Sequence, residues 1–174
     1  MARIAYVNGR YRPHRDAMVH VEDRGYQFAD GVYEVVAVAG GKLVDEDWHL
    51  DRLERSLREL KFGTMPDRRE LEEVHRTLVA NNEIGEGYVY LQVTRGAYGA
   101  RDFVAPEAPR LTIFMFAEPR ALGENGLTWL KVHLANVSGV DKVPLADRIR
   151  HSEERVALLR DTVRDPLADE RVQW

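Results

Sequence analysis

Glu22-Asp-Arg-Gly-Tyr-Gln-Phe-Ala-Asp-Gly-Val-Tyr-Glu34 is the stretch of this chain that says most about its fold. It is dense in charge, glycine and aromatic residues, and it leads directly into the apolar, β-branched run Val32–Val38, which predicts a buried strand. The part from Val19 to Asp30 has no regular apolar period, so we interpret it as an ordered loop. Loops held by a rigid scaffold often carry functional residues. A purely structural alternative is a turn in which Asp23 and Arg24 pair locally, the glycines relieve strain and the aromatic residues fill the core.

Two hairpins are predicted around this run. Before it, the apolar segment Ile4–Val7 is followed by Asn8-Gly9 and then Tyr11. Asn-Gly tolerates the positive φ angles of a type I′ turn, so this pattern indicates a tight hairpin. After it, Gly40-Gly41 separates the buried strand from Lys42–Val44, which predicts a second hairpin.

The apolar spacing then changes to that of helices. Most apolar residues recur three or four apart, which predicts an amphipathic helix that begins near Asp45 or Asp47 and ends by Gly63. A second helix is predicted over residues 66–82, opened by Pro-Asp and closed by Asn-Asn. Each helix has one apolar face, which must be buried against another element.

Two nearly apolar runs, Gly87–Thr94 and Arg110–Phe116, predict interior strands covered on both faces. The order β-β-β-β-α-α-β-β predicts an α+β fold, in which two helices cover one face of a mostly antiparallel sheet. After Pro119 the pattern changes: residues 127–137 could form a strand, and residues 144–164 mostly keep helical spacing in a strongly charged segment.

Composition excludes several classes of protein. The chain has 174 residues, a formal net charge of −4 and no cysteine. No basic surplus is present for a nucleic-acid partner, and no apolar run approaches the roughly 20 residues that span a bilayer. Neither a disulfide nor a thiolate metal site can form, and the six histidines show no metal-ligand spacing, so we expect no metal. The first residues lack the apolar region of a secretory signal, so the expected compartment is the cytoplasm.

The run from Glu22 to Glu34 resembles the N-terminal signature of D-amino-acid aminotransferases, which are class IV (fold type IV) enzymes that use pyridoxal 5′-phosphate (PLP). The resemblance continues through Asn8-Gly9, His49-Leu-Asp-Arg-Leu53 and Tyr90-Leu-Gln-Val-Thr-Arg-Gly96, and it covers roughly residues 1 to 118. Branched-chain aminotransferases and aminodeoxychorismate lyases share this fold with a looser version of the motif.

The resemblance also implies a division of the chain. Residues 1–120 would form the small domain of a D-amino-acid aminotransferase-like fold. Residues 121–174 would form a linker and a truncated or divergent start of the large domain.

Arg52 matches the arginine that this family supplies to the cofactor phosphate. A guanidinium suits that task, because its planar fork can bind phosphate oxygens and stays charged at any working pH. The alternative is an exposed helix arginine beside Asp51 and Glu54. Arg55 and Arg58 lie on the same helix without a motif match, so we interpret them as surface residues.

Three further residues are implied to bind substrate. Tyr33 matches a tyrosine on the substrate side of the PLP ring, and Val35 would line the same pocket with Ala37, because alternate strand residues share a face. Arg101 matches, with a one-residue offset, an arginine that reaches into the partner subunit's site and binds the substrate carboxylate. The histidine of the family pattern is missing; Asp102 stands nearby and would repel that carboxylate or pair with Arg101.

The lysine that binds PLP covalently has no counterpart at the matching position. Asp147-Arg-Ile-Arg150 echoes the family segment that precedes it, but no lysine follows. Lys142 is a weak candidate, because it lies too early and suits a solvated linker. The catalytic residue is therefore unknown from the sequence.

The function implied by the resemblance is PLP-dependent transamination between a D-amino acid and a 2-oxo acid, by a homodimer without nucleic-acid or membrane partners. One alternative is a catalytically incomplete small-domain fragment that acts only as a dimerising or structural module. Another is a relative of the branched-chain aminotransferases or the aminodeoxychorismate lyases.

Overall fold

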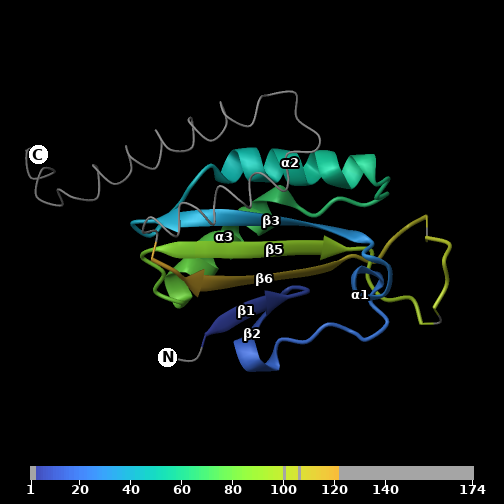
Figure 1. Ribbon diagram of the computed structural model, residues 1–174, viewed down its shortest axis with the longest axis horizontal. Coiled ribbons are helices and arrows are strands. Elements are labelled where there is room, and N and C mark those ends of the chain that lie inside the picture. The colour runs from blue at the N-terminus through green and yellow to red at the C-terminus, as the bar shows by residue number, and fades with distance from the viewer. Residues whose placement is uncertain (1–2, 100, 106, 122–174) are drawn as a thin grey trace, which may run out of the picture. The chain divides into compact units, whose positions relative to one another are not determined.

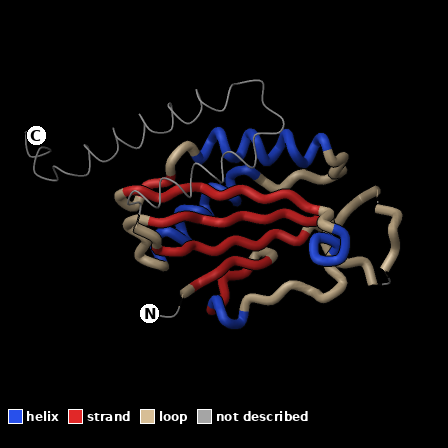
Figure 2. The backbone as a smooth tube through the Cα atoms, in the orientation of Figure 1, coloured by secondary structure: helices blue, strands red, loops and turns tan. Residues whose placement is uncertain are grey.

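A six-stranded sheet organises residues 3–99, 101–105 and 107–121, which are the residues that this computed structural model describes (Figures 1 and 2). Each strand pairs antiparallel with its neighbours. The strand order is β2 (Arg10–Pro13), β1 (Ile4–Val7), β6 (Thr112–Pro119), β5 (Gly87–Thr94), β3 (Gly31–Ala39) and β4 (Lys42–Leu43).

Both predicted hairpins are present. Asn8 and Gly9 have φ angles of 47° and 82°, so both adopt the positive φ that a type I′ turn between β1 and β2 requires. Gly40 and Gly41, with φ angles of 57° and 74°, make the equivalent turn between β3 and β4.

The two predicted amphipathic helices are α2 (Glu46–Glu59) and α3 (Arg68–Asn81). Asp67 caps α3 by accepting hydrogen bonds from the backbone N–H groups of Arg69 and Glu70. In Figure 1, α3 lies behind the strands and α2 runs along the β3 side of the sheet. The predicted α+β fold is confirmed.

The hydrophobic core lies between the helices and one face of the sheet. Along β5, the buried Val89, Leu91 and Val93 alternate with the half-buried Tyr88 and Tyr90. The prediction that these central strands are covered on both faces is therefore wrong for the described residues: the second face carries large aromatic side chains that keep part of their surface open. The core side chains come from every layer of the fold: Tyr6, Val38, Leu50, Leu53, Leu57, Phe62, Leu71, Val74, Leu78, Val79, Ile84, Val89, Leu91, Val93, Met115 and Ala117.

A short helix, α1 (Arg24–Phe28), replaces part of the predicted loop. Its first turn is capped by Asp23, whose Oδ1 accepts a hydrogen bond from the Gly25 N–H at 2.8 Å. The helix ends at Ala29, which has a φ of 55°. Five residues are too few to show an apolar period, so the sequence pattern could not reveal this helix.

A compact unit spans Met1–Arg120. The strand and helix predicted in residues 127–137 and 144–164, and Lys142, lie outside the described residues. The domain division therefore stays a prediction. Within the described part of the chain, the structure contains no helix long and apolar enough to cross a membrane.

Candidate active site

Glu34 is a buried carboxylate on β3 that binds two side chains of α2. Its Oε1 accepts a hydrogen bond from Arg52 Nε at 2.7 Å, and its Oε2 accepts one from Arg52 Nη2. His49 Nδ1 pairs with Oε2 at 2.8 Å, and it must be the donor because an ionised carboxylate can only accept. All three residues are buried. The sequence-based alternative for Arg52, an exposed arginine beside Asp51 and Glu54, is wrong: Arg68 of α3 pairs with those carboxylates.

Arg52 has one nitrogen left over. The Trp48 ring covers one face of the guanidinium, with Cζ 4.7 Å from the ring centroid. Glu34 binds Nε and Nη2, while the buried Nη1 has no hydrogen-bond partner among the described residues. A buried donor without a partner is costly, so Nη1 indicates a place where an acceptor outside the described chain belongs. A phosphate oxygen fits that position chemically.

Tyr33 and Val35 lie on the opposite face of β3 from Glu34. Tyr33 pairs in register with Gln92, and Val35 pairs with Tyr90, so all four side chains are on the face away from the helices. The Tyr33 and Tyr90 rings stack at 5.6 Å with planes 13° apart. Ala37 follows on the same face. Burial, and then the charge of Tyr33, raises the pKa of Tyr90 to about 12, so its phenol stays protonated at neutral pH.

The two groups of residues lie on opposite faces of β3, which has one edge that is largely unpaired. Along its inner edge β3 pairs with β5 from Gly31 to Val38, whereas β4 pairs only with Val38 and Ala39 on the outer edge. The outer edge from Gly31 to Val36 therefore has no strand partner among the described residues. A ligand that contacted both Arg52 and Tyr33 could pass around this unpaired edge.

Arg101 lies elsewhere, beside Phe28 of α1. Its guanidinium stacks on the rings of Phe28 and Phe103, at 4.7 Å and 4.8 Å from their centroids. Asp102 Oδ1 accepts a hydrogen bond from the Val104 N–H at 3.0 Å. Within one chain, the structure does not bring Arg101 to Tyr33 or Arg52 by any contact among the described residues.

Most charged side chains of the Glu22–Glu34 run form hydrogen bonds or ion pairs within the fold. Their partners differ from the local Asp23–Arg24 pair that the structural alternative predicted. Asp23 accepts hydrogen bonds from the Gly25 N–H and from Thr94 Oγ1, whereas Arg24 pairs with Asp30 rather than with Asp23. Tyr26 does not fill the core, since its exposed fraction is 80%.

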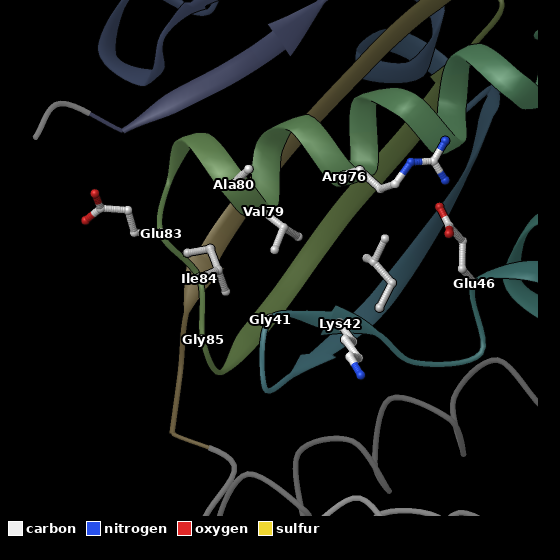
Figure 3. Close-up of a pocket in the computed structure, with 10 residues that line it drawn as sticks. Gly41, Lys42, Glu46, Arg76, Val79, Ala80, Glu83, Ile84 and Gly85 are labelled. Carbon is white, nitrogen blue, oxygen red and sulfur yellow. The ribbon is translucent and has the colours of Figure 1, made fainter. Parts of the chain in front are cut away.

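A groove of about 550 Å³ opens on another part of the molecule (Figure 3). In Figure 3, Val79 and Ile84 form its apolar wall, and Arg76 and Glu46 point toward one another at its other end. None of the residues assigned above to cofactor or substrate lines it. Among the described residues, no group of three or more metal-ligating side chains could hold a metal ion.

Sequence reasoning assigned no role to Glu34, His49 or Trp48. One signal could have found the first: a carboxylate inside an apolar strand must have buried partners, because an unpaired buried charge is very costly. His49 and Arg52 are three residues apart on α2 and therefore share a face of the helix.

Comparison with known proteins gives consistent findings. Residues 31–152 match the family model of amino-transferase class IV. A D-alanine aminotransferase of Listeria monocytogenes serotype 1/2a is 42% identical over 119 residues, which are 68% of this chain and 41% of that protein. The chain thus spans about two fifths of the length of this curated relative.

Two solved structures show the same fold. Branched-chain amino acid aminotransferase of Escherichia coli matches with a TM-score of 0.64 and 21% identity, over 72% of this chain and 43% of that one. A second branched-chain amino acid aminotransferase, complexed with N-(5′-phosphopyridoxyl)-L-glutamate, matches with a TM-score of 0.62 and 19% identity, over 68% of this chain and 41% of that one.

Proposed function

This chain belongs to the class IV aminotransferase family, and from that premise we propose that it serves PLP-dependent transamination between a D-amino acid and a 2-oxo acid. The observation that carries the proposal is Arg52 Nη1, a buried donor without a partner among the described residues. Relatives named D-alanine aminotransferase support a D-amino acid as the donor, and D-alanine is the first substrate to test.

Arg52 would hold the cofactor phosphate through Nη1, while Glu34 and Trp48 fix the guanidinium in one orientation. PLP, when bound, supplies an electron sink that stabilises negative charge at the substrate Cα. Burial of the Arg52–Glu34 pair strengthens the attraction for an anion at this edge, because water screens it poorly there. Glu34 also offsets part of the arginine charge, so a phosphate dianion needs further donors from outside the described residues.

Tyr33 and Val35 would form the substrate side of the site. The Tyr33 ring is stacked on Tyr90 and is therefore restricted in its movement, and its hydroxyl is a group able to donate to a substrate carboxylate. Ala37, on the same face, adds no charge. No lysine is assigned to the proton transfer at Cα, and Lys142 remains only a weak candidate.

A homodimer is the proposed assembly. Large apolar side chains are exposed on α1 and on the two segments that flank it: Met18, Val21, Tyr26, Phe103 and Val104. Exposed apolar surface of this kind is typical of an interface. A second copy on this surface would also meet Arg101, which agrees with an arginine that acts in the partner's site. Sedimentation at micromolar concentration should give a dimer, and a stable monomer would contradict this assembly.

Binding of PLP tests the cofactor assignment directly. Trp48 stacks on Arg52, so PLP at this arginine should quench tryptophan fluorescence in a saturable way. We expect Arg52→Lys to weaken binding about tenfold or more, because lysine has one nitrogen and cannot bind Glu34 and the phosphate through separate nitrogens as arginine would. Arg58→Lys, an exposed change on the same helix, is the matched control and should bind as the unmodified chain does.

Transamination is measured as pyruvate formed from D-alanine and a 2-oxo acid, with L-alanine as the stereochemical control. Absence of saturable PLP binding in the unmodified chain would overturn the cofactor assignment for this chain. Binding without any D-alanine turnover would overturn the activity, and would favour the module without catalysis.

A further inference from the structure

Asp30 is a carboxylate that joins two buried arginines. Its Oδ2 accepts a hydrogen bond from Arg24 Nε at 2.8 Å, and its Oδ1 accepts one from Arg95 Nε at 2.8 Å. Two guanidinium groups therefore share one negative charge in a part of the molecule that water screens poorly. Each arginine directs its other nitrogens to backbone carbonyl groups, which complete its hydrogen bonding.

Arg24 uses those nitrogens to hold the segment that follows Arg101. Its Nη1 donates to the Asp102 carbonyl at 2.6 Å and contacts the Val104 carbonyl at 3.4 Å. Its Nη2 reaches the Phe103 carbonyl at 3.5 Å. Residues 101–105 are all exposed, so burial of their side chains does not hold this segment in place. Arg24 binds three of its carbonyl groups, and Arg101 and Phe103 add contacts to the Phe28 ring.

Arg95 donates hydrogen bonds to carbonyl groups that directly follow the last residue of α2. Its Nη1 donates to the Lys61 carbonyl at 3.2 Å, its Nη2 donates to the Leu60 carbonyl, and its Cζ lies 4.1 Å from the centroid of the Phe62 ring. Carbonyl groups at a helix C-terminus carry partial negative charge, so a cation is favoured there. Arg95 thereby connects Asp30 to the helix that carries Arg52.

We propose that Arg24 is a positioning residue that fixes the 101–104 segment, and that Asp30 anchors Arg24 to the sheet and, through Arg95, to the end of α2. Arg101 is then presented from a segment fixed relative to the helix that would hold the phosphate. The inference rests on the proposed function only for the role of Arg101; the anchoring itself rests on the contacts of Arg24, Asp30 and Arg95.

Limited proteolysis of the full chain tests the anchoring. Chymotrypsin should cut after Phe103, which is exposed, only when the segment detaches from Arg24. Arg24→Lys keeps the charge but can reach only one of the partners, so we expect cleavage at this bond to rise about tenfold or more. The cleaved bond is identified by mass spectrometry. The urea midpoint of each protein is measured alongside the cleavage rate, so that a local release of the segment is distinguished from a loss of global stability. Arg58→Lys is the control with an exposed arginine and should leave the cleavage rate unchanged.

The unmodified chain provides a second measurement, in case Arg24→Lys does not fold. If Arg24 anchors the segment, cleavage after Phe103 should accelerate as low concentrations of urea are added, because opening precedes cutting. Cleavage in the unmodified chain that is fast and independent of urea would overturn the inference, as would equal rates for the unmodified chain and a folded Arg24→Lys.

The role of Arg101 is judged separately. Arg24→Lys should raise KM for the D-amino acid more than it lowers kcat, because a positioning loss weakens substrate capture. An unchanged KM in Arg101→Lys would remove Arg101 from the proposed function, while the cleavage rates alone decide whether Arg24 anchors the segment.

Discussion

At the scale of single residues, the buried ion pair of Glu34 and Arg52 joins β3 to α2, and in the proposed function it would also bind the cofactor phosphate. The carboxylate satisfies two of the three guanidinium nitrogens and leaves the third. The pair is buried, so its charges depend on one another: desolvation makes either charge costly when it is alone. Because Nη1 has no hydrogen-bond partner among the described residues, we assign this pair a binding role as well as a structural one.

Removal of one charge should therefore destabilise the fold. We expect Glu34→Gln to lower the free energy of unfolding by about 3–5 kcal/mol, because Arg52 would remain buried and uncompensated. Urea unfolding followed by circular dichroism measures this. The matched control is Glu54→Gln, a partly exposed partner of Arg58, with an expected change of about 0.5 kcal/mol or less.

The double variant Glu34→Gln with Arg52→Met separates stability from binding. Neither charge remains buried in it, so it should recover much of the lost stability and still fail to bind PLP. A Glu34→Gln protein as stable as the unmodified chain would contradict the description of this pair as mutually dependent.

At the scale of the elements, the close packing of α1 against the sheet depends on glycine. A Cβ atom on Gly25 would lie 2.3 Å from Thr94 Cγ2, and one on Gly31 would lie 2.8 Å from the Val93 carbonyl oxygen. Gly25 thus permits the contact of α1 with β5, and Gly31 permits the close pairing of β3 with β5. Thr94 is also fixed from the other side, because its hydroxyl donates to Asp23.

Gly25→Ala should cost about 1–3 kcal/mol of stability, because it overpacks the contact between α1 and β5. Thr94→Ser removes Cγ2, the methyl group that the new Cβ would overlap, and keeps the hydroxyl that donates to Asp23. Added to Gly25→Ala, it should recover part of the loss, as measured by thermal unfolding of the single and double variants. If the two changes are simply additive, the contact is not the cause.

Buried and half-buried tyrosines, Tyr6 in the core and Tyr88 and Tyr90 on the aromatic face of the sheet, have a consequence for the whole molecule at high pH. Burial is the largest cause that raises the pKa values of Tyr6, Tyr88 and Tyr90, and that of Tyr90 rises from 10.0 to about 12. Above pH 10 the unfolded chain loses these protons before the folded chain does. The native state then binds more protons, so the free energy of unfolding falls as pH rises.

We expect the urea midpoint to fall between about pH 9 and about pH 11, and to fall less in Tyr90→Phe, which cannot ionise. Both proteins are also compared at about pH 7, where the phenol is protonated in either state. An equal fall in the two proteins would show that Tyr90 does not contribute to the pH dependence.

Local patterns were enough to predict much of this fold. The hairpin at Asn8-Gly9 and the helices α2 and α3 depend on neighbouring residues: turn φ angles and apolar spacing are local properties. α1 was missed because a helix of five residues, held by one cap and by close packing on β5, shows no period. The aromatic face was misjudged because apolar residues alone do not say which face is covered.

The sequence by itself determined the class of the fold, the family, and Arg52, Tyr33, Val35 and Arg101 as the candidates for function. Only the tertiary structure decided that Arg52 is buried on Glu34, with Nη1 unpartnered among the described residues, since the strand and the helix that meet there are separated in the chain. It also decided that Arg24 and Asp30 serve the 101–104 segment. The physical reason is that a buried charge finds its partner by proximity in space, which no local pattern encodes.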